Sequence, residues 1–167
     1  MRCPKCDHPF SREKVYSYSL SDILLKKSYV CSRCGELIHF FFYFQENVWD
    51  SFAWTQTGEK KWAKKISSFC KGKTNCLYIP PESKEIERTI YSFFSVYGEE
   101  KTVIFLPEFL ECGIKQKEQI FILPSLFFPV SPSYLAEKLI LENFPGEKFA
   151  SSPTLLLFSS FGEKNGD

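Results

Sequence analysis

The chain has 167 residues, of which 44% are hydrophobic and 17% aromatic, so it carries enough apolar material for a packed core and is not typical of a disordered protein. Its 21 Lys and Arg nearly balance its 20 Asp and Glu, and a net charge of +1 excludes a general attraction to nucleic acid or anionic membranes. The first cysteine, residue 3, leaves no room for a preceding leader, and the apolar stretch Leu37–Phe44 is too short to span a bilayer, so we expect a cytoplasmic protein with no membrane partner.

Two cysteine pairs with the same two-residue gap stand near the start of the chain. They are Cys3, Cys6, Cys31 and Cys34. The sulfurs of such a pair reach one ion from a tight turn, and two turns complete a tetrahedral shell of four thiolates with no open position. In a reducing compartment, paired cysteines are metal ligands more often than disulfides. The spacing therefore predicts a structural Zn²⁺ site, with iron as the alternative because four thiolates also accept it.

Residues around the pairs fit this interpretation. Gly35 follows the second pair and suits a turn that needs positive φ, and Asp7 is a tolerable substitute in the first. The stretch between the pairs fits a β-hairpin. The two histidines, His8 and His39, are not needed as ligands, and we expect His39 on a strand spanning Glu36–Gln45.

In residues 1–45, the paired cysteines resemble those of the zinc-ribbon superfamily. The resemblance implies metal binding and a small β-rich fold, but no function, because zinc ribbons serve in transcription, translation, enzymes and scaffolds alike. The arrangement is also similar to the bacterial CpXC domain, a four-cysteine family of unknown role. The second pair departs from that family, since it reads Cys-Ser-Arg-Cys where the family has Cys-Pro-x-Cys.

Residues 46–74 are predicted to be an aromatic and basic connecting segment. Aromatic side chains are dense from residue 40 to residue 54, and one hypothesis is that this 40–54 segment docks a protein partner or a second copy of the chain. Thr57-Gly58 is interpreted as a turn. From Glu59 onward, apolar residues recur at helical spacing, and Gly72 offers a stop.

A cluster of lysines accompanies this predicted helix. Glu59 is the one acidic residue in the same stretch. The members of the cluster are Lys60, Lys61, Lys64, Lys65, Lys71 and Lys73. Interleaved with Trp62, these cations can follow a nucleic-acid backbone. The alternative is that they form the solvated face of an amphipathic helix. Gly72-Lys73-Thr74 is not interpreted as a phosphate-binding loop, because residue 67 is serine and a helix, not a strand, precedes the motif.

Residues 75–161 are predicted to form a small α/β domain, and residues 162–167 a polar tail. Strands are expected at Cys76–Ile79, Thr102–Leu106, Gln119–Leu123, Leu126–Val130 and Thr154–Phe158. Helices are expected from Pro80-Pro81 to Gly98 and from Ser131-Pro132 to Phe144. The predicted fold class is therefore α+β, with an N-terminal β-rich zinc ribbon followed by helices packed on a short mixed sheet.

Polar residues follow three of these strands, where α/β proteins place ligands. They are Glu82, Ser83, Glu108, Cys112, Ser131 and Ser133. One hypothesis is a small enzyme that uses Glu108 and its neighbours; the alternative is that these residues cap helices. The remaining cysteines, Cys70, Cys76 and Cys112, form either a second, incomplete metal site or part of the core. No catalytic constellation is predicted. The leading hypothesis is a non-enzymatic binding or regulatory protein with nucleic acid as its first partner.

Overall fold

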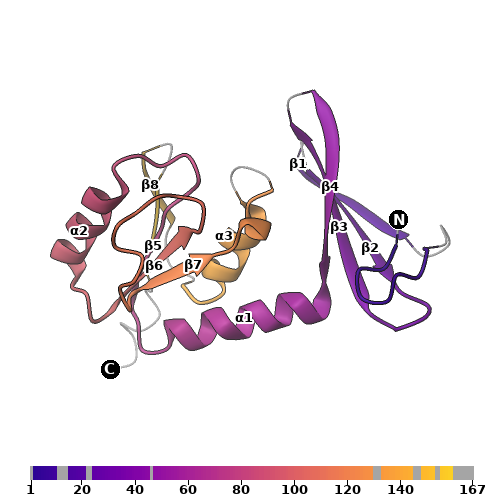
Figure 1. Ribbon diagram of the computed structural model, residues 1–167, viewed down its shortest axis with the longest axis horizontal. Helices are drawn as coiled ribbons and strands as arrows, with labels where there is room; N and C mark the ends of the chain where they lie inside the picture. Colours follow the sequence, from indigo (N-terminus) through magenta and orange to yellow (C-terminus); the bar gives the residue numbers. More distant parts are fainter. Residues whose placement is uncertain are drawn as a thin grey trace. The chain divides into compact units, whose positions relative to one another are not determined.

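The computed structural model describes residues 2–10, 15–21, 24–45, 47–129, 133–144, 148–152 and 155–159. The chain divides into two compact units, Met1–Lys64 and Lys65–Asp167. The first unit contains a four-stranded sheet and the second a five-stranded sheet, with helices on the connecting segments (Figure 1). The predicted α+β fold class is confirmed. The predicted polar tail, residues 162–167, lies outside the described residues.

The first sheet is an antiparallel meander with the strand order β1-β2-β3-β4. Its strands are β1 (Val15–Ser21), β2 (Leu24–Val30), β3 (Leu37–Gln45) and β4 (Val48–Thr55). The hairpin expected between the cysteine pairs is β1–β2, and the strand expected to carry His39 is β3. Asn47 has a φ of 63° in the tight turn between β3 and β4, a conformation that asparagine tolerates better than most residues.

Strand β3 buries side chains on both of its faces. Ile38 and Phe40 join a small cluster with Tyr29 and two of the cysteines. On the opposite face, Phe41 stacks on its cross-strand partner Phe52 with ring centroids 4.9 Å apart. This explains why the strand reads as a continuous apolar run, since alternation is lost when both faces are covered.

Helix α1 (Gln56–Cys70) begins one turn earlier than the sequence predicts. The interpretation of Thr57-Gly58 as a turn was wrong, because the Oγ1 of Thr55 accepts a hydrogen bond from the N–H of Gly58 at 2.9 Å and so caps the helix. A Cβ on residue 58 would lie 2.9 Å from that same Oγ1. Glycine is therefore needed here for the close approach of the cap, and its presence does not end the helix.

The second sheet is mixed and has the order β7-β6-β5-β9-β8. Strands β5 (Asn75–Tyr78), β6 (Thr102–Pro107) and β7 (Ile120–Leu123) are parallel, and β9 (Leu155–Ser159) pairs antiparallel with both β5 and β8 (Lys148–Ser152). Helix α2 (Ile86–Tyr97) packs Ile90 and Phe94 against the sheet in one apolar cluster. The mixed sheet with helices is as predicted.

Several predictions for this unit were wrong, among them the start of one helix and the presence of one strand. The helix expected from Pro80-Pro81 begins only at Ile86, and it ends as predicted at Gly98, whose φ is 83°. Where a strand was expected at Leu126–Val130, the described residues form a 3-10 helix, η1 (Ser125–Phe127), and Val130 lies outside the described residues. Because the N–H groups of Phe127 and Phe128 bond back to Pro124 and Ser125, they are not available to a sheet.

Candidate metal centre

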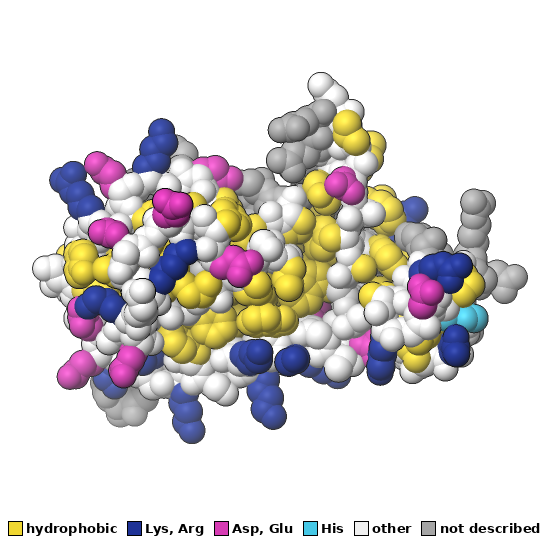
Figure 2. Space-filling view, viewed as in Figure 1, with side chains coloured by type: hydrophobic (Ala, Val, Ile, Leu, Met, Phe, Trp, Pro, Cys, Tyr) yellow, Lys and Arg dark blue, Asp and Glu magenta, His cyan; other side chains and the backbone are white. Residues whose placement is uncertain are grey.

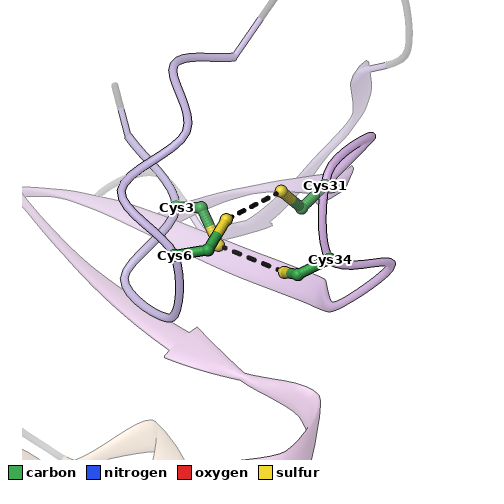
Figure 3. A group of neighbouring side chains, drawn as sticks. All are labelled: Cys3, Cys6, Cys31 and Cys34. Carbon is green, nitrogen blue, oxygen red and sulfur yellow. Dashed lines mark hydrogen bonds between the residues drawn. The ribbon is translucent and has the colours of Figure 1, made fainter.

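Four sulfur atoms converge at one end of the first unit (Figure 3). They belong to the predicted ligands Cys3, Cys6, Cys31 and Cys34, and all lie within 4.8 Å of one another. The Sγ atoms of Cys3 and Cys34 are 3.7 Å apart, and those of Cys6 and Cys31 are 3.5 Å apart. A tetrahedron with metal–sulfur bonds of about 2.3 Å has edges of about 3.8 Å. The cluster therefore has the size of a tetrathiolate metal shell.

The two cysteine turns share one backbone pattern. In the first, the N–H of Cys3 donates to the carbonyl of His8 at 2.9 Å, and the N–H of Asp7 donates to the carbonyl of Cys3 at 2.8 Å. In the second turn the same bonds join Cys31 to Glu36 at 2.9 Å and Gly35 to Cys31 at 2.8 Å. Each turn thus points two sulfurs at one centre from a closed loop of backbone, which preorganises the site for an ion.

Positive φ occurs at the equivalent position of each turn, as the sequence predicts. Asp7 has a φ of 62° and Gly35 a φ of 74°. A Cβ on residue 35 would meet no atom within 4 Å, so only the backbone conformation favours glycine there. Asp7 supplies the same conformation with a short polar side chain, which tolerates the left-handed region.

The electrostatics of the thiols favour a bound cation. The backbone N–H of Cys34 lowers the pKa of the Cys31 thiol, and burial opposes this effect. The N–H of Arg33 lowers the pKa further, and the result is about 6. The N–H of His8 lowers the pKa of Cys6, but burial and the neighbouring thiols raise it by more, to about 12. The Cys31 thiolate forms readily, and its negative charge then disfavours ionisation of the neighbouring thiols. A divalent metal removes this repulsion, because its positive charge replaces the protons.

Neither histidine joins the sulfur cluster. The Nε2 of His8 lies 3.1 Å from the Oγ of Ser32, and the Nδ1 of His39 lies 2.8 Å from the Oγ of Ser28. In the part of the chain that the structure describes, the tetracysteine cluster is the only group of three or more potential metal ligands this close together. The candidate ligands are therefore four cysteine sulfurs.

The other three cysteines belong to the second unit. Cys70 and Cys76 are buried, and burial raises the pKa of Cys70 to about 12 and that of Cys76 well above its ordinary value. Cys112 packs at the margin of the α2 cluster. The interpretation of these residues as small core side chains fits their surroundings.

Glu36 is a site residue that the sequence reasoning missed. It is only 7% exposed, and its carboxylate accepts hydrogen bonds from the N–H of Thr57 at 2.7 Å and from the Oγ1 of Thr57 at 2.9 Å. Lys5, inside the first cysteine turn, places its Nζ 3.5 Å from the same carboxylate. The hydrogen bonds from Thr57 lead in lowering the pKa of Glu36. Both cysteine turns are thereby joined to the first turn of α1.

Replacing Glu36 by alanine is expected to loosen the start of α1. Loss of the carboxylate leaves the N–H of Thr57 without its acceptor, so amide exchange at Thr57 should accelerate by about 10-fold or more in hydrogen–deuterium exchange with metal present. Lys5→Gln is the matched control, because the Lys5 side chain is 53% exposed and its ion pair adds little. Equal exchange in both variants would mean that Thr57 does not depend on Glu36.

The six predicted lysines are only partly grouped. Four lie on α1 with exposed side chains, on the helix face opposite the buried Ile66 and Cys70: Lys60, Lys61, Lys64 and Lys65. Dark blue side chains follow this helix in Figure 2. Lys71 is exposed beyond the helix end, while the Nζ of Lys73 donates to the carbonyl of Glu100 at 2.7 Å. Lys73 is thus hydrogen-bonded within its own unit, whereas Lys71 and the four α1 lysines have exposed side chains.

Two of the polar residues proposed for an enzyme site have capping roles. The Oε1 of Glu108 accepts the N–H of Ser125 at the start of η1, at 2.8 Å. The Oγ of Ser133 caps α3 (Tyr134–Leu141) by accepting the N–H of Ala136. The prediction of Ser131 as the cap of this helix was wrong, because the cap is Ser133, and the helix ends at Leu141 instead of Phe144. Ser131 itself lies outside the described residues. Glu82 is exposed, Ser83 is half-buried and Cys112 packs on the core.

Comparison of this chain with protein-family models, with curated proteins and with solved structures found no match. Among the described residues, no helix has both the length and the apolar character that a bilayer span requires.

Proposed function

We propose that the chain is a zinc-ribbon protein that binds nucleic acid and has no catalytic role. The proposed binding surface, which we call the lysine face, consists of Lys60, Lys61, Lys64 and Lys65 on α1. The observation that carries the proposal is the combination of a closed tetracysteine cluster with an adjoining helix whose exposed face is cationic. A four-thiolate shell with no open position suits a structural ion, and Zn²⁺ favours thiolates in tetrahedral geometry. A reducing cytoplasm would keep the four thiols available to the metal.

The zinc part is tested by metal analysis of the purified chain without added metal. We expect elemental mass spectrometry to find one zinc ion per chain. Iron in place of zinc, with the visible absorption of an iron–thiolate centre, would contradict it. Binding of this kind contributes on the order of 10–16 kcal/mol to folding, enough to stabilise a module with a small core.

The lysine face is not explained by the stability of α1. Lys60 and Lys64 are four residues apart, as are Lys61 and Lys65, and like charges at this spacing destabilise a helix by about 0.2–0.5 kcal/mol per pair. The helix has no basic residue in its last turn, where its dipole would favour one, and Glu59 is its only acidic residue. These charges are therefore better explained by an anionic partner than by helix formation.

The lysine face is tested by changing Lys60, Lys61, Lys64 and Lys65 together to glutamine. We expect weaker binding to duplex DNA, with the slope of log affinity against log salt reduced by about 3 to 4. The measurement is fluorescence anisotropy with the zinc-loaded chain at several salt concentrations. The matched control changes four lysines of the second unit outside α1 to glutamine: Lys84, Lys101, Lys115 and Lys117. Identical slopes in the two variants, or no binding by the unaltered chain, would refute the proposal.

A further inference from the structure

One face of the first sheet carries aromatic rings that continue outward from the metal cluster. Even-numbered residues of β3 share this face, and Phe44 lies directly across from Trp49 on β4. The two ring centroids are 5.4 Å apart, and the residues are 37% and 54% exposed. Phe42, half-buried, connects them to the cluster of Tyr29 and Phe40. Hydrophobic side chains are visible at the outer end of the β3–β4 hairpin in Figure 2.

A cation accompanies these rings. The Nζ of Lys27 lies 5.3 Å from the centroid of Phe42. Lys27 pairs with Phe40 across β2 and β3, which places it on the same face as Phe42, Phe44 and Trp49. We call these four residues the aromatic–lysine strip.

On the described strand residues, this face of the sheet carries no acidic side chain. Asp50 of β4 is on the other face, where it accepts a hydrogen bond from the hydroxyl of Tyr43 at 3.2 Å. Lys27 therefore supplies a positive charge beside exposed aromatic rings, a combination that is complementary to a polyanion.

We propose that the aromatic–lysine strip binds single-stranded nucleic acid, with unpaired bases stacked on Trp49 and Phe44 and a phosphate held by Lys27. This inference rests on the proposed nucleic-acid function and specifies the form of its ligand. Unpaired bases expose π-faces that stack on aromatic side chains, whereas bases in a duplex stack on each other. Exposed rings next to a cation are the pattern of a stacking platform for single strands.

The test compares an oligothymidylate strand with a duplex of equal length, by fluorescence anisotropy at low salt with the zinc-loaded full chain. Trp49→Ala is expected to weaken single-strand binding by about 10-fold and to leave duplex binding unchanged. Trp49→Phe should retain most of the affinity, because phenylalanine also stacks. The control is Phe109→Ala, which removes a 49% exposed ring from the second unit.

The outcomes separate this inference from the proposed function. If Trp49→Ala binds both probes like the unaltered chain, the strip is not a stacking platform, although the lysine face can still bind. If the unaltered chain binds neither probe, both proposals fail. If the unaltered chain self-associates in sedimentation and Trp49→Ala is monomeric with unchanged single-strand binding, the strip is a protein-docking surface and the inference is overturned.

Discussion

Replacing Cys31 by serine is expected to abolish stoichiometric metal binding and to unfold the first unit. Cys3 and Cys31 are 2% and 1% exposed, and they lie in the same cluster as Tyr29, Ile38 and Phe40. The candidate ligands thus also form the centre of a core that is too small to be stable alone. Loss of the metal is therefore expected to disrupt this core as well. We expect elemental analysis to show less than one zinc per chain and hydrogen exchange to show loss of protection in β2 and β3.

The matched control for this variant is Cys112→Ser. Cys112 is half-buried and lies outside the tetracysteine cluster, so its replacement should leave the metal content and the protection of β3 unchanged. A chelator should reproduce the Cys31→Ser pattern in the unaltered chain. Retention of one zinc per chain and of full protection in Cys31→Ser would contradict the assignment of this residue as a ligand.

Replacing Phe105 by alanine is expected to destabilise the second unit by about 3–5 kcal/mol. Phe105 is fully buried in the central part of β6, and its ring lies 5.5 Å from that of Phe121 and 6.2 Å from that of Phe69. Truncation leaves a cavity that two large rings cannot fill without leaving their rotamers. Denaturant unfolding monitored by circular dichroism gives the change in free energy.

The same experiment tests whether the two units are independent. Phe105→Ala should retain its zinc, since the candidate ligands all belong to the first unit and the described part of the second unit contains no such cluster. The exposed Phe109 is the control, and its replacement by alanine should cost less than about 1 kcal/mol. A loss of stability in Phe105→Ala no greater than that of the control would show that the core is not packed around this ring.

The clustering of the four cysteines could be predicted because its signal is local. Two residues separate the members of each pair, and the turn that brings their sulfurs together is built from those same residues and Gly35. Strands β6 and β7 were also predictable, because each is a short run of apolar residues in a buried sheet.

Features that depend on distant partners could not be predicted in this way. Glu36 and Thr57 are separated by 21 positions in the chain, and nothing near Glu36 indicates that its carboxylate receives a helix N-terminus. Strand β8, Lys148–Ser152, escaped prediction because it pairs on one side only and ends in small polar residues. The start of α1 was misplaced because glycine usually marks a break, whereas Gly58 makes room for the hydroxyl of Thr55.

The position of β5 in its sheet has a consequence for synthesis of the chain on the ribosome. β5 pairs with β6 on one side and, on the other, with β9, which begins at Leu155. Until β9 has emerged, a nascent chain exposes an unpaired edge next to Cys76 and Leu77, a surface prone to aggregation. The four clustered cysteines and the cap of α1, by contrast, are all present once Gly58 has been translated. The tetracysteine cluster of the first unit can therefore form while the second unit still awaits its last strands.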